Sequence, residues 1–344
     1  MYSKIKFWLI FFMPVIAGCG QNNPHEVNVS DIEAEVELKR FEKDFFAINE
    51  EHFREEFLDL KNKYPDKAEL MVEQILGFGR IDDKTDNYIR PLQHRFYGDE
   101  YIRELNEDIQ EKYDEETISK LEEELTDAFK HLRYYYPDAE LPDLHTTLTS
   151  FTYSVITYEE LMAISLDMYM GEDYKFYPSL DFPSYKLRRM NEHYITPDVL
   201  TSWALNEYPE SEYTDNSLLS KMIYEGKLLY FLDVMMPRAH DSLKIQYTSD
   251  QLNWSEHFES KIWSYFVEED MLFKTENHIL DRYLEDGPFT SSPGFSQESP
   301  PRLGAWAGWR IVRSYMKNNE EVTLHELMEN REAERILQAS GYRP

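Results

Sequence analysis

Cysteine is almost absent from this chain. Its 344 residues include a single one, Cys19. A lone thiol excludes an intrachain disulfide and every metal site that needs several thiolates. No residue other than Cys19 could act as a catalytic thiolate.

Basic residues are also scarce. Against 66 Asp and Glu the chain has 36 Lys and Arg, so its formal net charge is −30. Binding to nucleic acid needs clustered cations that release counterions, and we therefore exclude nucleic acid as a partner. Gly (12) and Pro (16) are few, whereas 42% of the residues are hydrophobic and 15% are aromatic. This composition predicts a packed core and not a disordered acidic chain.

Complete catalytic motifs are missing as well. The His-Glu-x-x-His motif of zinc hydrolases does not occur: His25-Glu26 and His325-Glu326 lack the second histidine, and no two histidines lie four residues apart. Gly-x-Ser-x-Gly, a phosphate-binding glycine loop and an Asp-x-Asp-x-Asp-Gly calcium loop are absent too. Glycoside hydrolases use a pair of carboxylates, but among 66 acids no particular pair can be singled out as such a site. We predict no cofactor, no catalytic residues and no metal site. The alternative is a metal site assembled from distant residues.

The N-terminus has the parts of a secretory signal peptide. Lys4 and Lys6 precede an apolar run at residues 7–17, which Gly18 and Cys19 follow. The run has 11 residues, whereas a membrane-spanning helix needs about 20. We therefore expect residues 1–18 to be a signal peptide and not a permanent transmembrane helix.

The end of this segment predicts a lipid anchor. Ile-Ala-Gly-Cys at residues 16–19 resembles the bacterial lipobox, in which a peptidase cuts before the cysteine and the cysteine becomes lipidated. The alternative is an ordinary signal peptide that happens to contain a cysteine. Residues 19–35 are then a lipidated N-terminus and tether to the membrane. Residues 20–23 lack the acidic stretch that resembles surface-export signals, which favours a cell-envelope protein facing the periplasm.

Residues 36–344 show no internal repeat and no linker, so we expect one mostly helical α+β domain. An irregular connection is predicted at the Gly- and Pro-rich segment 287–304. Alternating residues predict a small antiparallel hairpin or sheet from the runs 147–156 and 160–169. Apolar spacing of three or four predicts helices at 38–63 with a break at Tyr64-Pro65-Asp66, and at 114–134, 185–194, 197–206, 215–236, 305–317 and 324–339.

The predicted helix at 215–236 is apolar around nearly its whole circumference and should be central. Gly226 in its interior costs about 1 kcal/mol relative to Ala, which indicates close approach by another backbone or by a ligand. Glu225 and Lys227 flank this glycine. They are either a salt-bridged glutamate and a snorkelling lysine, or part of a binding site.

Three separated blocks and the C-terminus resemble the family of gliding-motility lipoproteins called GldB, from Bacteroidetes. The similarity runs from about Glu37 to the end of the chain. The segments that carry it are Met222–Lys227, Tyr247–Trp254, Gly304–Met316 and Ala339–Pro344.

The resemblance implies an envelope lipoprotein needed for gliding, with other envelope proteins of the gliding and secretion machinery as partners. The family is also similar, distantly, to zinc metallopeptidases of the zincin type. In those enzymes a Glu-Gly pair on a second helix supplies the third metal ligand, as Glu225-Gly226 would here. The preceding helix, at 199–206, has no histidine. The resemblance thus implies a degenerate zincin-like fold without catalysis, acting in binding or as an accessory component. The alternative is a metal-dependent hydrolase or peptidase with a non-standard site.

A candidate binding cleft follows from the same segments. If the Pro- and Gly-rich segment before Trp306 meets the central helix, Trp306 and Tyr230 would wall a cleft with Glu225 at its floor and Lys227 nearby. A partner peptide or a glycan could occupy such a cleft.

Overall fold

A computed structural model describes residues 25–81 and 86–344. The predicted signal peptide and Cys19 lie outside the described residues. Within the described part of the chain, no helix is long and apolar enough to cross a membrane.

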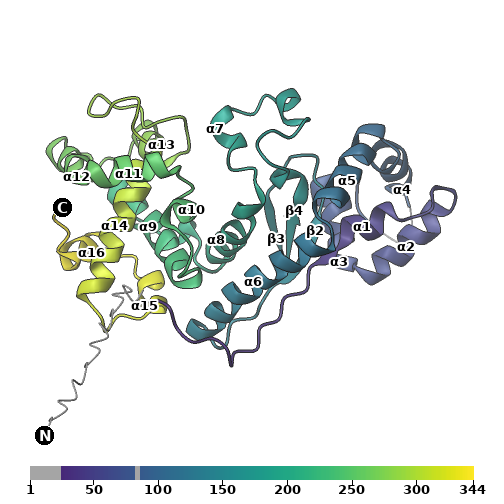
Figure 1. Ribbon diagram of the computed structural model, residues 1–344, viewed down its shortest axis with the longest axis horizontal. Helices are drawn as coiled ribbons and strands as arrows, with labels where there is room; N and C mark the ends of the chain where they lie inside the picture. Colours follow the sequence, from purple (N-terminus) through teal and green to yellow (C-terminus); the bar gives the residue numbers. More distant parts are fainter. Residues whose placement is uncertain (1–24, 82–85) are drawn as a thin grey trace, which may run out of the picture.

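The molecule is elongated, and its central four-stranded sheet separates two groups of helices (Figure 1). Helices α1 to α5 gather at one end, and α9 to α16 gather at the other. The strands are β1 (Lys39–Arg40), β2 (Asp143–Thr147), β3 (Val155–Tyr158) and β4 (Leu161–Ser165). The helices are α1 (Phe41–Phe46), α2 (Phe53–Lys63), α3 (Pro65–Glu69), α4 (Ile89–Pro91), α5 (Glu100–Lys112), α6 (Glu115–Tyr135), α7 (Ser184–Leu187), α8 (Ile195–Glu207), α9 (Leu218–Met235), α10 (Asp241–Ile245), α11 (Ser249–His257), α12 (Glu259–Glu268), α13 (Asn277–Leu284), α14 (Leu303–Asn318), α15 (Leu324–Glu329) and α16 (Ala333–Ser340).

Most of the predicted helices are confirmed. In the first group, Phe41, Phe45, Phe53 and Phe57 are buried in one aromatic cluster, and the chain breaks at Tyr64 as expected. The central helix begins after Ser217, whose hydroxyl accepts a hydrogen bond from the amide of Ser220. Two predictions need correction. The expected helix at 185–194 is only α7 and a short 3₁₀ turn, and the one at 324–339 is split into α15 and α16.

The predicted antiparallel hairpin is confirmed as β3 and β4, and it is part of a larger sheet. Its strand order is β1-β2-β4-β3, and only β3 and β4 pair antiparallel, so the sheet is mixed. The predicted strand at 147–156 is wrong in its middle, where Ser150 and Phe151 adopt left-handed backbone conformations (φ 55° and 63°). The carboxylate of Asp167 accepts hydrogen bonds from the amides of Thr149 (3.3 Å) and Phe151 (2.5 Å). These bonds replace the ladder bonds of a strand.

The segment predicted to be a tether packs against the domain in its described part. The chain before β1 extends past α6 (Figure 1). Val29 and Ala34 are buried, the guanidinium of Arg133 donates to the carbonyl of Glu33 (2.8 Å), and the amide of Val36 donates to Thr126 Oγ1 (3.0 Å).

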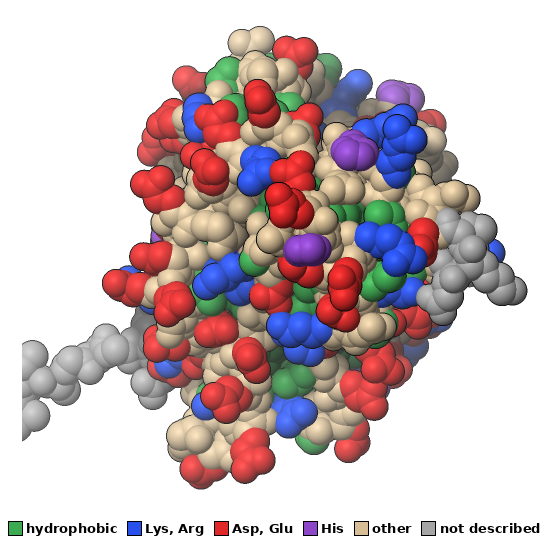
Figure 2. Space-filling model, turned by 90° about the vertical axis from the view of Figure 1, so that its right-hand side faces the viewer, with side chains coloured by type: hydrophobic (Ala, Val, Ile, Leu, Met, Phe, Trp, Pro, Cys, Tyr) green, Lys and Arg blue, Asp and Glu red, His purple; other side chains and the backbone are tan. Residues whose placement is uncertain are grey.

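Acidic side chains are spread over the end of the molecule formed by α1 to α5, with fewer basic ones between them (Figure 2). The excess of carboxylates is therefore distributed over this surface and not gathered at one point. Like charges that are spread out in water repel only weakly because salt screens them.

Gly226 of α9 and Gly308 of α14 bring the two central helices into direct backbone contact. A Cβ atom on Gly308 would lie 1.7 Å from the carbonyl oxygen of Met222, and one on Gly226 would lie 2.3 Å from the carbonyl carbon of Gly308. Both distances are far below van der Waals contact. The close approach expected at Gly226 is thus confirmed, and its partner is a backbone.

Replacing Gly308 by Ala should force α9 and α14 apart. We expect Gly308→Ala to lower the free energy of unfolding by about 3 kcal/mol, since overpacking cannot be relieved against a backbone. Gly287→Ala is the control, because a Cβ there would lie 3.7 Å from its nearest heavy atom. Its effect should stay within about 0.5 kcal/mol. Urea unfolding followed by circular dichroism measures both, and equal stability of the two variants would contradict the packing described.

Candidate functional site

The four residues predicted to form a cleft lie in separate surroundings. Trp306 is 1% exposed in the core, with the guanidinium of Arg310 over its ring. Tyr230 lines a cavity of about 830 Å³, where the ring of His25 meets it edge to face at 5.2 Å. Glu225 and Lys227 do not line that cavity. The structure therefore does not bring the four side chains into that one cavity, and their part in binding stays a prediction.

Glu225 is held by an arginine from the start of α14. Its Oε2 accepts a hydrogen bond from Arg302 Nη2 at 2.8 Å, and both side chains are largely shielded from water. Although burial alone would lower the pKa of Arg302, the neighbouring charge of Glu225 raises it. Arg302 precedes α14 in a left-handed conformation (φ 55°), which an arginine adopts only where its surroundings hold it.

A second carboxylate, Asp198 of α8, faces this pair from the neighbouring helix. It accepts hydrogen bonds from the hydroxyl of Tyr169 and the side-chain amide of Gln246, both at 2.8 Å. Burial raises the pKa of Asp198, while the charges of Arg189 and Arg302 oppose the rise. The two carboxylates thus have guanidinium, phenol and amide groups as their partners.

These residues do not fit a zinc ligand set. Oε2 of Glu225 is taken by Arg302, the oxygens of Asp198 are taken by Tyr169 and Gln246, and α8 contains no histidine. Within residues 25–81 and 86–344, no group of three or more His, Cys, Asp or Glu side chains is placed to hold a metal ion.

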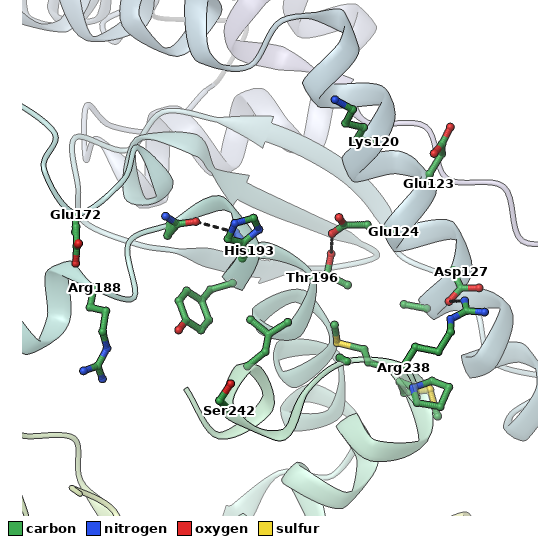
Figure 3. Close-up of a pocket in the computed structure, with 18 residues that line it drawn as sticks. Lys120, Glu123, Glu124, Asp127, Glu172, Arg188, His193, Thr196, Arg238 and Ser242 are labelled. Carbon is green, nitrogen blue, oxygen red and sulfur yellow. Dashed lines mark hydrogen bonds and ion pairs between the residues drawn. The ribbon is translucent and has the colours of Figure 1, made fainter. Parts of the chain in front are cut away.

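A groove of about 850 Å³ lies beside this network, between α6 and α10 (Figure 3). Charges of both signs line it. Lys120, Glu123, Glu124 and Asp127 come from α6, whereas Glu172, Arg188 and Arg238 come from the segments before α8 and after α9. We name it the α6–α10 groove.

Contacts across the α6–α10 groove tie its walls together. Arg238 donates to Asp127 at 2.7 Å, and Thr196 donates to Glu124 at 3.5 Å. Arg188 reaches the carbonyl of Gln246 (3.4 Å), which links the groove to the network around Asp198. The Nε of Arg188 is buried and has no hydrogen-bond partner among the described residues. The groove can therefore offer the carboxylate acceptors of α6 and the partly exposed side chain of Arg188 to a bound polar segment.

Sequence reasoning missed a buried ionic cluster between α9 and α14. Asp233 is 2% exposed and accepts hydrogen bonds from Lys244 (2.9 Å), Trp309 Nε1 (2.9 Å) and Arg313 (2.6 and 2.7 Å). Arg313 also binds Asp241 at 2.6 Å. The signal was present in the sequence, because Asp233 is the one acid in the apolar second half of α9.

The side chain of Lys227 is buried and makes hydrogen bonds within the fold. It is 1% exposed, and its ammonium donates to the hydroxyl of Tyr213 and to the carbonyls of Met328 (2.9 Å) and Asn330 (2.7 Å). These carbonyls belong to the end of α15 and the residue after it. By taking them, Lys227 explains why the predicted helix at 324–339 is interrupted there.

Comparison with known proteins gives one family. A family model described as gliding motility protein GldB matches residues 22–344. Curated proteins and solved structures include none that matches this chain.

Replacing Lys227 should change how stability depends on pH. Burial lowers the pKa of Lys227 to about 7 in the folded chain, against about 10.4 when unfolded. Between these two pKa values Lys227 is protonated in the unfolded chain and largely neutral in the folded chain. The contribution of Lys227 to the free energy of unfolding therefore rises with pH. The difference in free energy of unfolding between wild type and Lys227→Met should grow by about 1 to 2 kcal/mol from pH 7 to pH 9.

Chemical unfolding at both pH values measures this difference. Lys261→Met is the control for replacing a lysine by methionine, because Lys261 is exposed, and it should change the free energy of unfolding by no more than about 0.5 kcal/mol. A pH-independent difference for Lys227→Met would contradict the burial of an ionisable group at this position.

Proposed function

Because the chain belongs to the family of the gliding motility protein GldB, we propose that it is a noncatalytic envelope lipoprotein that binds a partner in the gliding machinery. Membership covers nearly the whole chain and agrees with the family predicted from the sequence. It implies involvement in gliding motility. The noncatalytic role, the partner and the lipid anchor are the parts we propose.

The pairing of Glu225 with Arg302 carries the proposal of a noncatalytic role. The resemblance to zinc metallopeptidases assigns this glutamate to a metal. Here a guanidinium, held at 2.8 Å, compensates its charge. A carboxylate that already has a buried cationic partner is a poor metal ligand, because binding a metal would leave the arginine uncompensated.

The α6–α10 groove is the surface through which we infer contact with the partner. The partly exposed side chain of Arg188 lines it, and a carboxylate or carbonyl of a bound segment would pair with that guanidinium. The acceptors of α6 on the facing wall suit the donors of the same segment.

A lipid on Cys19 would place the protein on a membrane with a defined side towards it. His25 packs on Tyr230, between α9 and the start of α15. Six residues of extended chain reach at most about 20 Å. The cavity at Tyr230 would therefore lie within that distance of the lipid. The periplasm-facing orientation is part of the proposal.

Complementation of a gliding-deficient deletion strain tests the noncatalytic role. We expect the double variant Glu225→Gln/Arg302→Gln to restore gliding, because it removes the ion pair as a unit and leaves no unpaired charge. Arg188→Gln should fold and yet fail to restore gliding. Arg90→Gln, which changes an exposed arginine elsewhere, should glide normally. Circular dichroism of each purified variant checks folding.

Two results would contradict the proposal. A folded Glu225→Gln/Arg302→Gln protein that does not support gliding would mean that Glu225 does more than pair with Arg302. Normal gliding with Arg188→Gln would remove the α6–α10 groove from the function. In the same strain, Cys19→Ser should give an unlipidated precursor by acyl labelling, and normal labelling would disprove the anchor.

A further inference from the structure

A second groove lies away from the α6–α10 groove, where the C-terminal ends of α6 and α8 meet the turn between β3 and β4. Its volume is about 780 Å³. We call it the acidic groove. Its lining runs from Tyr135 to Pro142, includes the β3–β4 turn around Glu159, continues along Trp203 to Tyr208, and ends at Thr323 and His325.

Aromatic rings form much of the acidic groove. The ring of Trp203 stacks on Phe231 at 5.6 Å with an interplanar angle of 11°, which fixes its orientation. Tyr136 packs against Trp203 (5.6 Å) and against His325 (5.9 Å). The hydroxyl of Tyr208 lies 3.1 Å from Nδ1 of His325. These contacts order the rings before any ligand arrives.

Carboxylates surround these rings. Five acids line the groove, and neither lysine nor arginine lines it. No ion pair to any of the five occurs in the part of the chain that the structure describes. All five are exposed, so their negative charges can attract a cation in the solvent in front of the groove. They are Asp138, Glu140, Glu159, Glu160 and Glu207.

This combination selects a cation that carries apolar stems. An ammonium or guanidinium is attracted both by the carboxylates and by the faces of the partly exposed Tyr rings. The methylene stems of Lys and Arg pack on the rings at the same time. An acidic or a purely apolar segment would make only part of these interactions.

We infer that the acidic groove binds a Lys- or Arg-rich segment of a partner protein. The positive charges of such a segment complement the carboxylates over an aromatic surface, and the groove accommodates several residues of an extended chain. It also adjoins the cavity that holds His25, because both are lined by Tyr135 and Thr323. This inference rests on the proposed function only in assigning the partner to the gliding machinery, since the groove and its ligand class follow from the described residues.

Binding of defined peptides to the purified full chain in an uncharged detergent tests the inference. The probe is a fluorescein-labelled peptide of alternating Lys and Gly, and the matched peptide has Glu in place of Lys. We expect the Lys peptide to bind saturably, as measured by fluorescence anisotropy, and the Glu peptide not to bind. Affinity should fall about fivefold between 50 and 300 mM salt, because exposed charges are screened.

Two triple variants with the same change in charge locate the site. Glu140→Gln/Glu159→Gln/Glu207→Gln should weaken binding of the Lys peptide about tenfold, since each exposed charge makes a small contribution and three are removed together. The control is Glu55→Gln/Glu107→Gln/Glu111→Gln, on α2 and α5, which changes exposed acids at the other end of the molecule. It should change the affinity less than twofold.

A single variant tests the aromatic part. Tyr208→Leu keeps an apolar side chain but removes a ring, and it should weaken binding about threefold. Three results would overturn the inference: no binding of the Lys peptide, equal loss in the two triple variants, or full affinity in Tyr208→Leu. Each of them can occur while the variants of the proposed function behave as expected, so the two failures are distinguishable.

Discussion

The backbone contact between Gly226 and Gly308 is the constraint on which the rest of the described structure most depends. It allows α9, an 18-residue helix buried along almost its whole length, to lie directly against α14. At this separation Arg302 reaches Glu225, and Trp309 and Arg313 reach Asp233. Side chains at either glycine would lengthen all these contacts together, because packed helices move as units.

Whether a carboxylate needs a compensating partner depends on that packing. Between α9 and α14 the carboxylate of Asp233 is shielded from water and is compensated by Arg313, and the partly exposed Glu225 pairs with Arg302. On the surface no such compensation is needed, and the five acids of the acidic groove are left unpaired among the described residues. The charge of Asp233 is thus compensated where it is buried, and the charges of the acidic groove remain available for attraction where they meet solvent.

The sequence predicted what depends on neighbours along the chain. Apolar spacing located the helices around Phe41 and at 114–134, and a glycine inside an apolar helix predicted the close approach at Gly226. It failed where a distant group decides the local structure. Asp167 bends the expected strand by binding the amide of Phe151, and the lysine on α9 ends α15. The partner of Glu225, 77 residues away, could not follow from any local spacing.

We propose above all that Glu225 is the partner of an arginine and not the ligand of a metal. Zinc content measures this most directly. Purified full-length protein would be dialysed against a trace of zinc, then against zinc-free buffer, and analysed by elemental mass spectrometry. We predict that the protein retains far less than one zinc per chain and that Glu225→Gln/Arg302→Gln does not differ from wild type. One tightly held zinc per chain that is lost in this double variant would contradict the account.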